Sequence, residues 1–129
     1  MLTKQKGDVA LGVAISYFIV SGYEVSLPIG DKRDYDLIIE KNGELSRVQV
    51  KHGGLYQGRT KCRVALRVMG GNQSFYYTKR YDSNAFEFLF VYTAKGEKFL
   101  IPWEGDIVNR SELSIESDKY SLYKIITQG

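Results

Sequence analysis

The chain has 129 residues, of which 43% are hydrophobic, and its net charge at pH 7 is +3. This length predicts a single domain, residues 1–129, whose core needs neither a disulfide nor a structural metal. The one cysteine, Cys62, excludes an intramolecular disulfide, and because there is only one histidine, His52, a Cys/His zinc site is excluded too.

The sequence has no feature typical of a membrane or secreted protein. The longest nearly apolar run, residues 13–20, is far shorter than the ~20 residues that a membrane-spanning helix needs. Residues 3–8 are polar and charged and do not resemble a signal peptide. Together with the lone cysteine, these features predict an intracellular, cytoplasmic protein without a membrane partner.

Basic residues are concentrated in the middle of the chain. Residues 45–81 contain eight Lys or Arg and no Asp or Glu, whereas both flanking regions contain more acids than bases. Neutralising phosphates releases counterions, so such a region favours a polyanion as partner; a solvated basic surface is the alternative. The predicted DNA contacts, which include basic residues before this region, are Lys4, Lys6, Arg33, Arg59, Lys61, Arg63, Lys79 and Arg80.

The first predicted element is an amphipathic helix over residues 4–21. Apolar residues recur there at helical spacing, and Gly22 follows as a C-terminal stop. Asp8 lies near the helix start, where an acid is favourable to the helix dipole, so this carboxylate has a structural as well as a functional interpretation. A short strand over residues 23–27 follows, and a charged loop leads from it to Asp36 at the start of the next strand.

Residues 35–51 are predicted to form a β-hairpin. Asn42-Gly43 between two alternating runs is the strongest short-range hairpin signal, because both residues tolerate the positive φ of a type I′ turn. A two-residue loop of this kind fixes the register, with Lys41 facing Glu44 across the turn.

This register brings polar residues together. Asp36 lies opposite Gln49, and Asp34 lies opposite Lys51. Opposed side chains have Cβ atoms roughly 4.5–5.5 Å apart, close enough for Asp36 and Gln49 to share one cation. The structural alternative is an exposed polar sheet face with a cross-strand ion pair between Asp34 and Lys51. The opposite face is predicted to be apolar and to carry Tyr35, Leu37, Ile39, Val48 and Val50.

The rest of the chain is predicted to consist mostly of strands. Residues 52–61 form a mobile basic loop that could close over a phosphate backbone, with an ordinary connection as the alternative. Residues 75–81 interleave aromatic and basic side chains, which suits base stacking and phosphate contact but equally a core edge. The other predicted elements are strands at 63–69, 85–92 and 99–102, a turn or short helix at 103–108, and a last strand at 120–126.

A helix followed by three strands, with an acid on the second strand and a polar-x-Lys on the third, resembles the PD-(D/E)XK nuclease superfamily. More closely, the chain is similar to the group I intron-associated branch, whose best-known members are homing endonucleases. The resemblance implies an α+β fold of the α/β type with a restriction-endonuclease-like core, in which an N-terminal helix precedes a mixed central β-sheet. The segments that carry it are TKQKGD at 3–8, GYEV at 22–25, PIG at 28–30, YDL at 35–37, RVQVK at 47–51 and FLIP at 99–102.

The resemblance also implies a metal-dependent catalytic site. Asp36 would be the charged ligand of Mg²⁺, or of Mn²⁺, and Gln49 stands where the more usual motif has a carboxylate. The backbone carbonyl of Val50 is the third ligand that the superfamily suggests, and Asp8 looks like the acid that related nucleases bring from their first helix. Lys51 would hold the scissile phosphate and the attacking water and stabilise the developing negative charge. Mg²⁺ commonly binds through only one or two carboxylates, so this oxygen set suits it.

The predicted function is that of a Mg²⁺-dependent endonuclease that hydrolyses phosphodiester bonds in double-stranded DNA in the manner of a homing enzyme. A domain this small cannot cover a long DNA site alone, so we expect a homodimer or homotetramer. A Holliday junction resolvase of the same fold is the nearest enzymatic alternative. The missing carboxylate at Gln49 leaves a catalytically inactive DNA-binding module as another, and a plain protein-interaction domain as a third.

Overall fold

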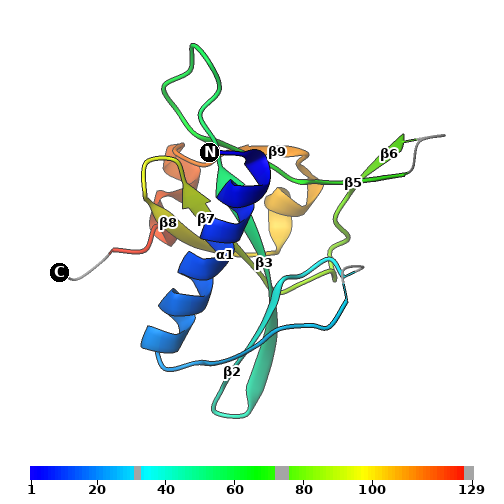
Figure 1. Ribbon diagram of the computed structural model, residues 1–129, viewed down its shortest axis with the longest axis vertical. Coiled ribbons are helices and arrows are strands. Elements are labelled where there is room, and N and C mark those ends of the chain that lie inside the picture. The colour runs from blue at the N-terminus through cyan, green and yellow to red at the C-terminus, as the bar shows by residue number, and fades with distance from the viewer. Residues whose placement is uncertain (31–32, 72–75, 127–129) are drawn as a thin grey trace.

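The computed structural model describes residues 1–30, 33–71 and 76–126 of the chain (Figure 1). The first element is α1 (Thr3–Val20), where Leu2 N donates to Gln5 Oε1 at 2.9 Å. The helix ends before Gly22, whose φ of +91° lets the chain reverse. Ala10, Ala14 and Phe18, spaced four residues apart, are fully buried and form the helix face that packs on the sheet.

The central sheet has five strands in the order β1-β2-β3-β7-β8. Only the β3/β7 pair is parallel, and the other three pairs are antiparallel, so the sheet is mixed. The predicted α+β architecture, an N-terminal helix followed by three strands of a mixed sheet, is thus confirmed. The five strands are β1 (Glu24–Ser26), β2 (Leu37–Lys41), β3 (Glu44–Gly53), β7 (Phe88–Thr93) and β8 (Lys98–Pro102).

The hairpin of β2 and β3 has the predicted turn and register. Asn42 and Gly43 both have positive φ, +55° and +80°, and Lys41 pairs with Glu44. The predicted apolar face lies under α1, where four of its residues pack with Phe90 into one buried cluster. Those four are Leu37, Ile39, Val48 and Val50. The fifth residue predicted for this face, Tyr35, packs instead against a second hydrophobic cluster on the opposite face.

The other face of the sheet is covered as well, by a second hydrophobic cluster built largely from the C-terminal half of the chain. Trp103, directly after β8, belongs to that cluster. Gln49 on β3 is only 8% exposed, so this is not the exposed polar sheet face of the structural alternative. The covering elements are β4 (Arg63–Ala65), η1 (Gly105–Asn109), β9 (Glu112–Ser114) and η2 (Asp118–Tyr123).

Two predicted strands differ from the structure. Residues 63–69 do not form one strand, because the chain breaks at Leu66, whose N–H donates to the Ser111 carbonyl at 2.8 Å. The part before the break, β4, pairs with β9, whereas β5 (Arg67–Gly71) pairs with β6 (Tyr76–Arg80) in a two-stranded ribbon that projects from the body in Figure 1. The alternation of apolar residues over 63–69 predicts which side is buried, but it cannot show that the two halves of this segment pair with different strands.

The predicted last strand, residues 120–126, is wrong. The chain forms the 3₁₀ helix η2 there, followed by a single bridge between Lys124 and Phe99 of β8. Tyr120 and Tyr123 both pack on the second cluster, and a spacing of three matches the period of a 3₁₀ helix. Within the described residues, no helix is long and apolar enough to cross a membrane.

Candidate active site

Asp36 lies directly before β2 and is held by the neighbouring strand through two backbone contacts. Its N–H donates to the Val48 carbonyl at 2.8 Å, and its Oδ2 accepts from the Val50 N–H at 2.8 Å. Burial raises the pKa of the Asp36 carboxyl, while the Val50 hydrogen bond and the charge of Lys51 oppose that rise. The fold therefore holds a carboxylate in a place where its charge is disfavoured.

Gln49 is the buried neighbour of this carboxylate. When its amide nitrogen faces Asp36, Nε2 donates to Asp36 Oδ2 at 3.2 Å and to the Asp34 carbonyl at 2.7 Å, and Oε1 accepts from the Tyr81 hydroxyl at 3.2 Å. In the opposite orientation, Nε2 donates to the Tyr81 hydroxyl at 3.2 Å and Oε1 faces the two other oxygens. Without a cation the first orientation is favoured, because it makes three hydrogen bonds and leaves no acceptors opposed.

Lys51 lies on the same face of β3, two residues beyond Gln49. Its Nζ is 5.2 Å from the centre of the Tyr81 ring. Burial lowers the pKa of the Lys51 ammonium, and the charge of Asp36 acts in the opposite direction. No ion pair joins Lys51 to Asp34 in the described part of the chain, so the cross-strand pair of the structural alternative does not form.

Tyr81 is the residue of this cluster that the sequence did not single out. Only its membership of the aromatic and basic segment 75–81 marked it, and nothing in that segment distinguishes one tyrosine from another; Phe75 itself lies outside the described residues. Tyr81 is 6% exposed, and its ring packs edge-on against Phe86 and Trp103 at centroid distances of 5.2 and 6.1 Å. Burial, Asp36 and Asp34 all raise the pKa of its hydroxyl, which therefore stays protonated.

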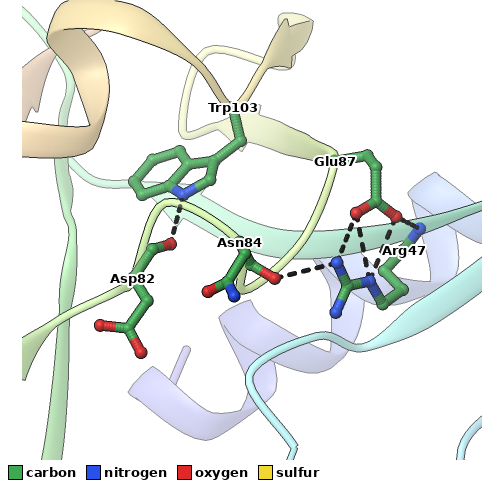
Figure 2. A network of polar contacts seen from close by, with 5 residues as sticks. All are labelled: Arg47, Asp82, Asn84, Glu87 and Trp103. Atoms are coloured by element: carbon green, nitrogen blue, oxygen red, sulfur yellow. Dashed lines mark hydrogen bonds and ion pairs between the residues drawn. The ribbon is translucent and has the colours of Figure 1, made fainter.

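A polar network holds the segment that follows Tyr81 against β3 (Figure 2). Arg47 binds Glu87 through both Nε and Nη2, with an Nη2–Oε2 distance of 2.5 Å, and Nη2 also donates to the Asn84 carbonyl at 2.9 Å. Trp103 Nε1 donates to the Asp82 carbonyl at 2.9 Å. The loop between β6 and β7 is thus fixed at both ends, and it places Tyr81 beside Gln49.

Asp8 is not brought into direct contact with the other candidate site residues. It lies in the second turn of α1, so the interpretation as a first-turn dipole partner does not apply. No hydrogen bond or ion pair of the described chain joins Asp8 to Asp36, Gln49 or Lys51. Asp8 lines a separate surface hollow with Met1, Gln5 and Val9, whereas Leu11 is the residue of α1 that lines the groove in which Asp36 lies.

That groove has a volume of about 350 Å³ and is open to solvent. Arg33 and Asp36 contribute its charged groups, so the structure places one of the predicted DNA contacts next to the candidate site. Its lining is Leu11, Leu27, Pro28, Gly30, Arg33, Tyr35 and Asp36.

The other predicted DNA contacts have different surroundings. Arg63 is paired with Glu112 at 2.6 Å, and Arg80 Nη1 donates to the Asn109 carbonyl at 2.6 Å, so both guanidinium groups have partners within the chain. The loop after β3 is anchored at its end, because Lys95 Nζ donates to the Thr60 carbonyl at 2.7 Å. The remaining exposed ones are Lys4, Lys6, Arg59 and Lys61. The side chain of Lys79 lies outside the described part of the structure.

The side chains and backbone groups around Asp36 suit a hard cation such as Mg²⁺, which prefers oxygen ligands. Within the described residues there is no group of three or more His, Cys, Asp or Glu side chains that could hold a metal. Asp36 instead supplies one carboxylate, the Asp34 carbonyl lies nearby, and the Gln49 amide presents its oxygen to them when Nε2 faces Tyr81. One carboxylate with neutral oxygens is a donor set of the kind that Mg²⁺ uses, with water completing its shell. The roles of the Val50 carbonyl and of Asp8 as ligands stay predictions.

Comparisons with known proteins cover almost the whole chain. The model of a family described as PD-(D/E)XK endonuclease matches residues 1–122. Among solved structures, a bacterial homing endonuclease, I-Ssp6803I, is similar with a TM-score of 0.81 and 29% identity, over 96% of this chain and 89% of that chain. No curated protein matches the sequence. The matched region includes α1, the β2–β3 hairpin, Tyr81 and the β7–β8 pair.

Proposed function

The chain belongs to the PD-(D/E)XK endonuclease family, and on that premise we propose that it is a Mg²⁺-dependent nuclease that hydrolyses phosphodiester bonds in double-stranded DNA. One observation supports this proposal above the others: Asp36 Oδ2, directly before β2, lies 3.2 Å from the side-chain amide of Gln49 on β3, and Lys51 lies on the same face of β3. A carboxylate, a neutral oxygen donor and an ammonium group are the parts that metal-assisted hydrolysis requires.

A divalent cation bound by Asp36 and Gln49 would neutralise charge on the phosphoryl oxygens and provide a nucleophilic water at neutral pH. Asp36 contributes the negative charge, and the Val50 N–H keeps its Oδ2 in place. Lys51 stabilises the negative charge that develops on the phosphate. Its lowered pKa, caused by burial, also brings its ammonium closer to proton transfer near neutral pH.

DNA binding is proposed for the basic residues that face solvent. Arg33 lies in the groove with Asp36 and is suited to the phosphate next to the cleaved bond, because a guanidinium binds two phosphate oxygens at once. Lys4, Lys6, Arg59 and Lys61 are suited to more distant phosphates. We propose that the substrate is duplex DNA. Because a domain of this size cannot cover a long DNA site alone, we also propose that two or four copies act together, one site for each strand.

Plasmid cleavage tests this proposal. Supercoiled DNA is incubated with the protein and Mg²⁺ or Mn²⁺, alongside Asp36→Asn and the control Asp106→Asn, which alters an exposed carboxylate on η1 that is paired with Arg110 and Lys119. We expect nicking and linearisation that need the cation, are lost in Asp36→Asn and persist in Asp106→Asn. Equal nicking by both variants would contradict the proposed catalytic site, because cleavage would then not require the Asp36 carboxylate.

The same assay separates the two alternatives. Preferred cleavage of a four-way junction over linear duplex would favour the Holliday junction resolvase. Salt-dependent DNA binding without cleavage of any substrate would favour the inactive DNA-binding module, for which the neutral Gln49 is the supporting observation, since it removes one charge from the cation site.

A further inference from the structure

Gln49 is a problem for a metal site, because an amide has two different ends. A carboxylate presents an oxygen whichever way it rotates, whereas a glutamine presents either an oxygen or an NH₂ group. Gln49 is 8% exposed, so water contributes little to fixing its orientation. Whichever orientation it adopts is decided by the protein groups around it.

The groups on one side of the amide are oxygens. Asp36 Oδ2 and the Asp34 carbonyl lie 3.2 and 2.7 Å from the amide atom that faces them. When that atom is nitrogen, it donates to both. When it is oxygen, three acceptors converge with no proton between them, an arrangement that is stable only if a cation lies among them. Binding of a cation therefore requires the amide to rotate by half a turn.

On the other side lies the Tyr81 hydroxyl, 3.2 Å from the amide in either orientation. A hydroxyl both donates and accepts. It donates to Oε1 when the nitrogen faces Asp36, and it accepts from Nε2 when the oxygen faces Asp36. Tyr81 can thus satisfy the amide before and after rotation, which a side chain that only donates or only accepts cannot do.

We propose that Tyr81 is a positioning residue that stabilises the metal-binding orientation of the Gln49 amide, so that a neutral side chain can serve where a carboxylate is usual. The proposal rests on the proposed function, because it presumes a divalent cation between Asp36 and Gln49. Tyr81 acts through Gln49 and needs no contact with DNA or with the cation.

The surroundings of Tyr81 suit this role. Its ring is held edge-on by Phe86 and Trp103, and the loop that follows is fixed by the Arg47–Glu87 pair and by the Trp103–Asp82 hydrogen bond (Figure 2). The hydroxyl therefore stays at one place while the smaller amide rotates.

Removing only the hydroxyl tests the proposal. Tyr81→Phe keeps the ring beside Lys51 and removes one hydrogen bond from each orientation of the amide. The cation-free orientation keeps both Nε2 donations and has only an unpaired carbonyl oxygen, whereas the metal-binding orientation has an NH₂ group with no acceptor. Buried unpaired donors are tolerated less well than unpaired carbonyl oxygens, so we expect Mn²⁺ to bind up to about tenfold more weakly, measured by calorimetry on the full chain without DNA. Tyr120→Phe is the matched control: Tyr120 is also buried in the second cluster, and its hydroxyl has no hydrogen-bond partner among the described residues. Its Mn²⁺ affinity should equal that of the wild type.

A second background separates orientation from general damage. In Gln49→Glu, the carboxylate presents an oxygen in every rotamer, so Tyr81→Phe should not weaken Mn²⁺ binding there. The side-chain amide resonances of Gln49 give a direct readout: Mg²⁺ should shift them strongly in the wild type, and the same shift should require up to about ten times more Mg²⁺ in Tyr81→Phe. Thermal unfolding of each variant shows that it is folded.

The outcomes distinguish the two proposals. If the wild type binds no Mn²⁺, the metal site itself and the function built on it are overturned. If the wild type binds Mn²⁺ and cleaves DNA but Tyr81→Phe binds it equally tightly, only the positioning role is overturned. Equal weakening by Tyr81→Phe in the wild type and in Gln49→Glu would likewise overturn it, because the loss would then not depend on the amide.

Discussion

Arg47 and Lys51 lie four residues apart on the same face of β3, and each has an acidic neighbour. Arg47 and Glu87 form a salt bridge, and their side chains are 37% and 41% exposed. Hydrogen bonding to Glu87 raises the pKa of Arg47, and hydrogen bonding to Arg47 lowers the pKa of Glu87, so the fold favours both charges. That pair fixes the loop of Figure 2.

Asp36 and Lys51 are the reverse case. Burial raises the pKa of Asp36 and lowers the pKa of Lys51, so in both residues the fold disfavours the charged form. Neither shift is removed by the attraction between the two charges. Structural ion pairs are stabilised by their surroundings, whereas groups whose charge is disfavoured in a groove mark a candidate catalytic site. Two basic residues of one strand can therefore have different roles, and the directions of these pKa shifts distinguish them.

The largest expected effect is on catalysis. Lys51→Met should reduce the rate of DNA cleavage roughly 10²–10³-fold, the usual cost of removing one group that stabilises charge in a transition state. Glu87→Gln removes a charge from the structural pair and should reduce it less than tenfold. Single-turnover cleavage of a linear duplex measures both rates. Comparable losses in the two variants would contradict the assignment of a catalytic role to Lys51 and a structural role to the Arg47–Glu87 pair.

A smaller and opposite effect is expected on stability. In the presence of EDTA, Asp36→Asn should raise the free energy of unfolding by roughly 0.5–2 kcal/mol, because it removes a disfavoured buried charge. Glu87→Gln should lower it by about 0.2–1 kcal/mol, the range for a solvent-exposed ion pair. Urea unfolding at pH 7 measures both changes in the free energy of unfolding. A loss of stability in Asp36→Asn would show that the fold does not disfavour the charge of Asp36.

The smallest effect is on the pH dependence of stability. The pKa of Glu87 is lowered, so its contribution is present above the ordinary value of 4.5 and is lost as the pH falls through the folded-state pKa. The pKa of Asp36 is raised above 3.8, so its ionised form destabilises the fold at neutral pH, and this penalty disappears as the pH falls.

Unfolding free energies between pH 7 and pH 3 therefore provide the check. The wild type should lose more stability over this range than Glu87→Gln, and less than Asp36→Asn, in which the relief on acidification is absent. Parallel curves for the three proteins would contradict the pKa directions on which the comparison rests.

The sequence predicted the hairpin well because its signals are local. Asn42-Gly43 demands positive φ, and the alternation of Leu37, Ile39 and Val48 with polar residues leaves one register that buries the apolar face. From that register, Asp36 is placed beside Gln49 without any knowledge of the rest of the fold. The helix and its stop at Gly22 follow from equally local signals.

Other features could not be predicted because they depend on partners distant in the chain. The break at Leu66 and the failure of the last strand follow from pairing with β9 and from packing of Tyr120, which local alternation does not encode. Arg63 looked like a free DNA contact until the fold placed Glu112 next to it.

By itself, the sequence determined the family resemblance, the order of helix and strands, and the Asp36, Gln49 and Lys51 set, because turn chemistry and side-chain alternation act over a few residues. Only the tertiary structure decided that this face is covered, that burial shifts the charges of Asp36 and Lys51, and that Tyr81, 32 residues beyond Gln49, completes the cluster. Burial and long-range contact arise when distant segments pack together, and no local pattern records which segments those will be.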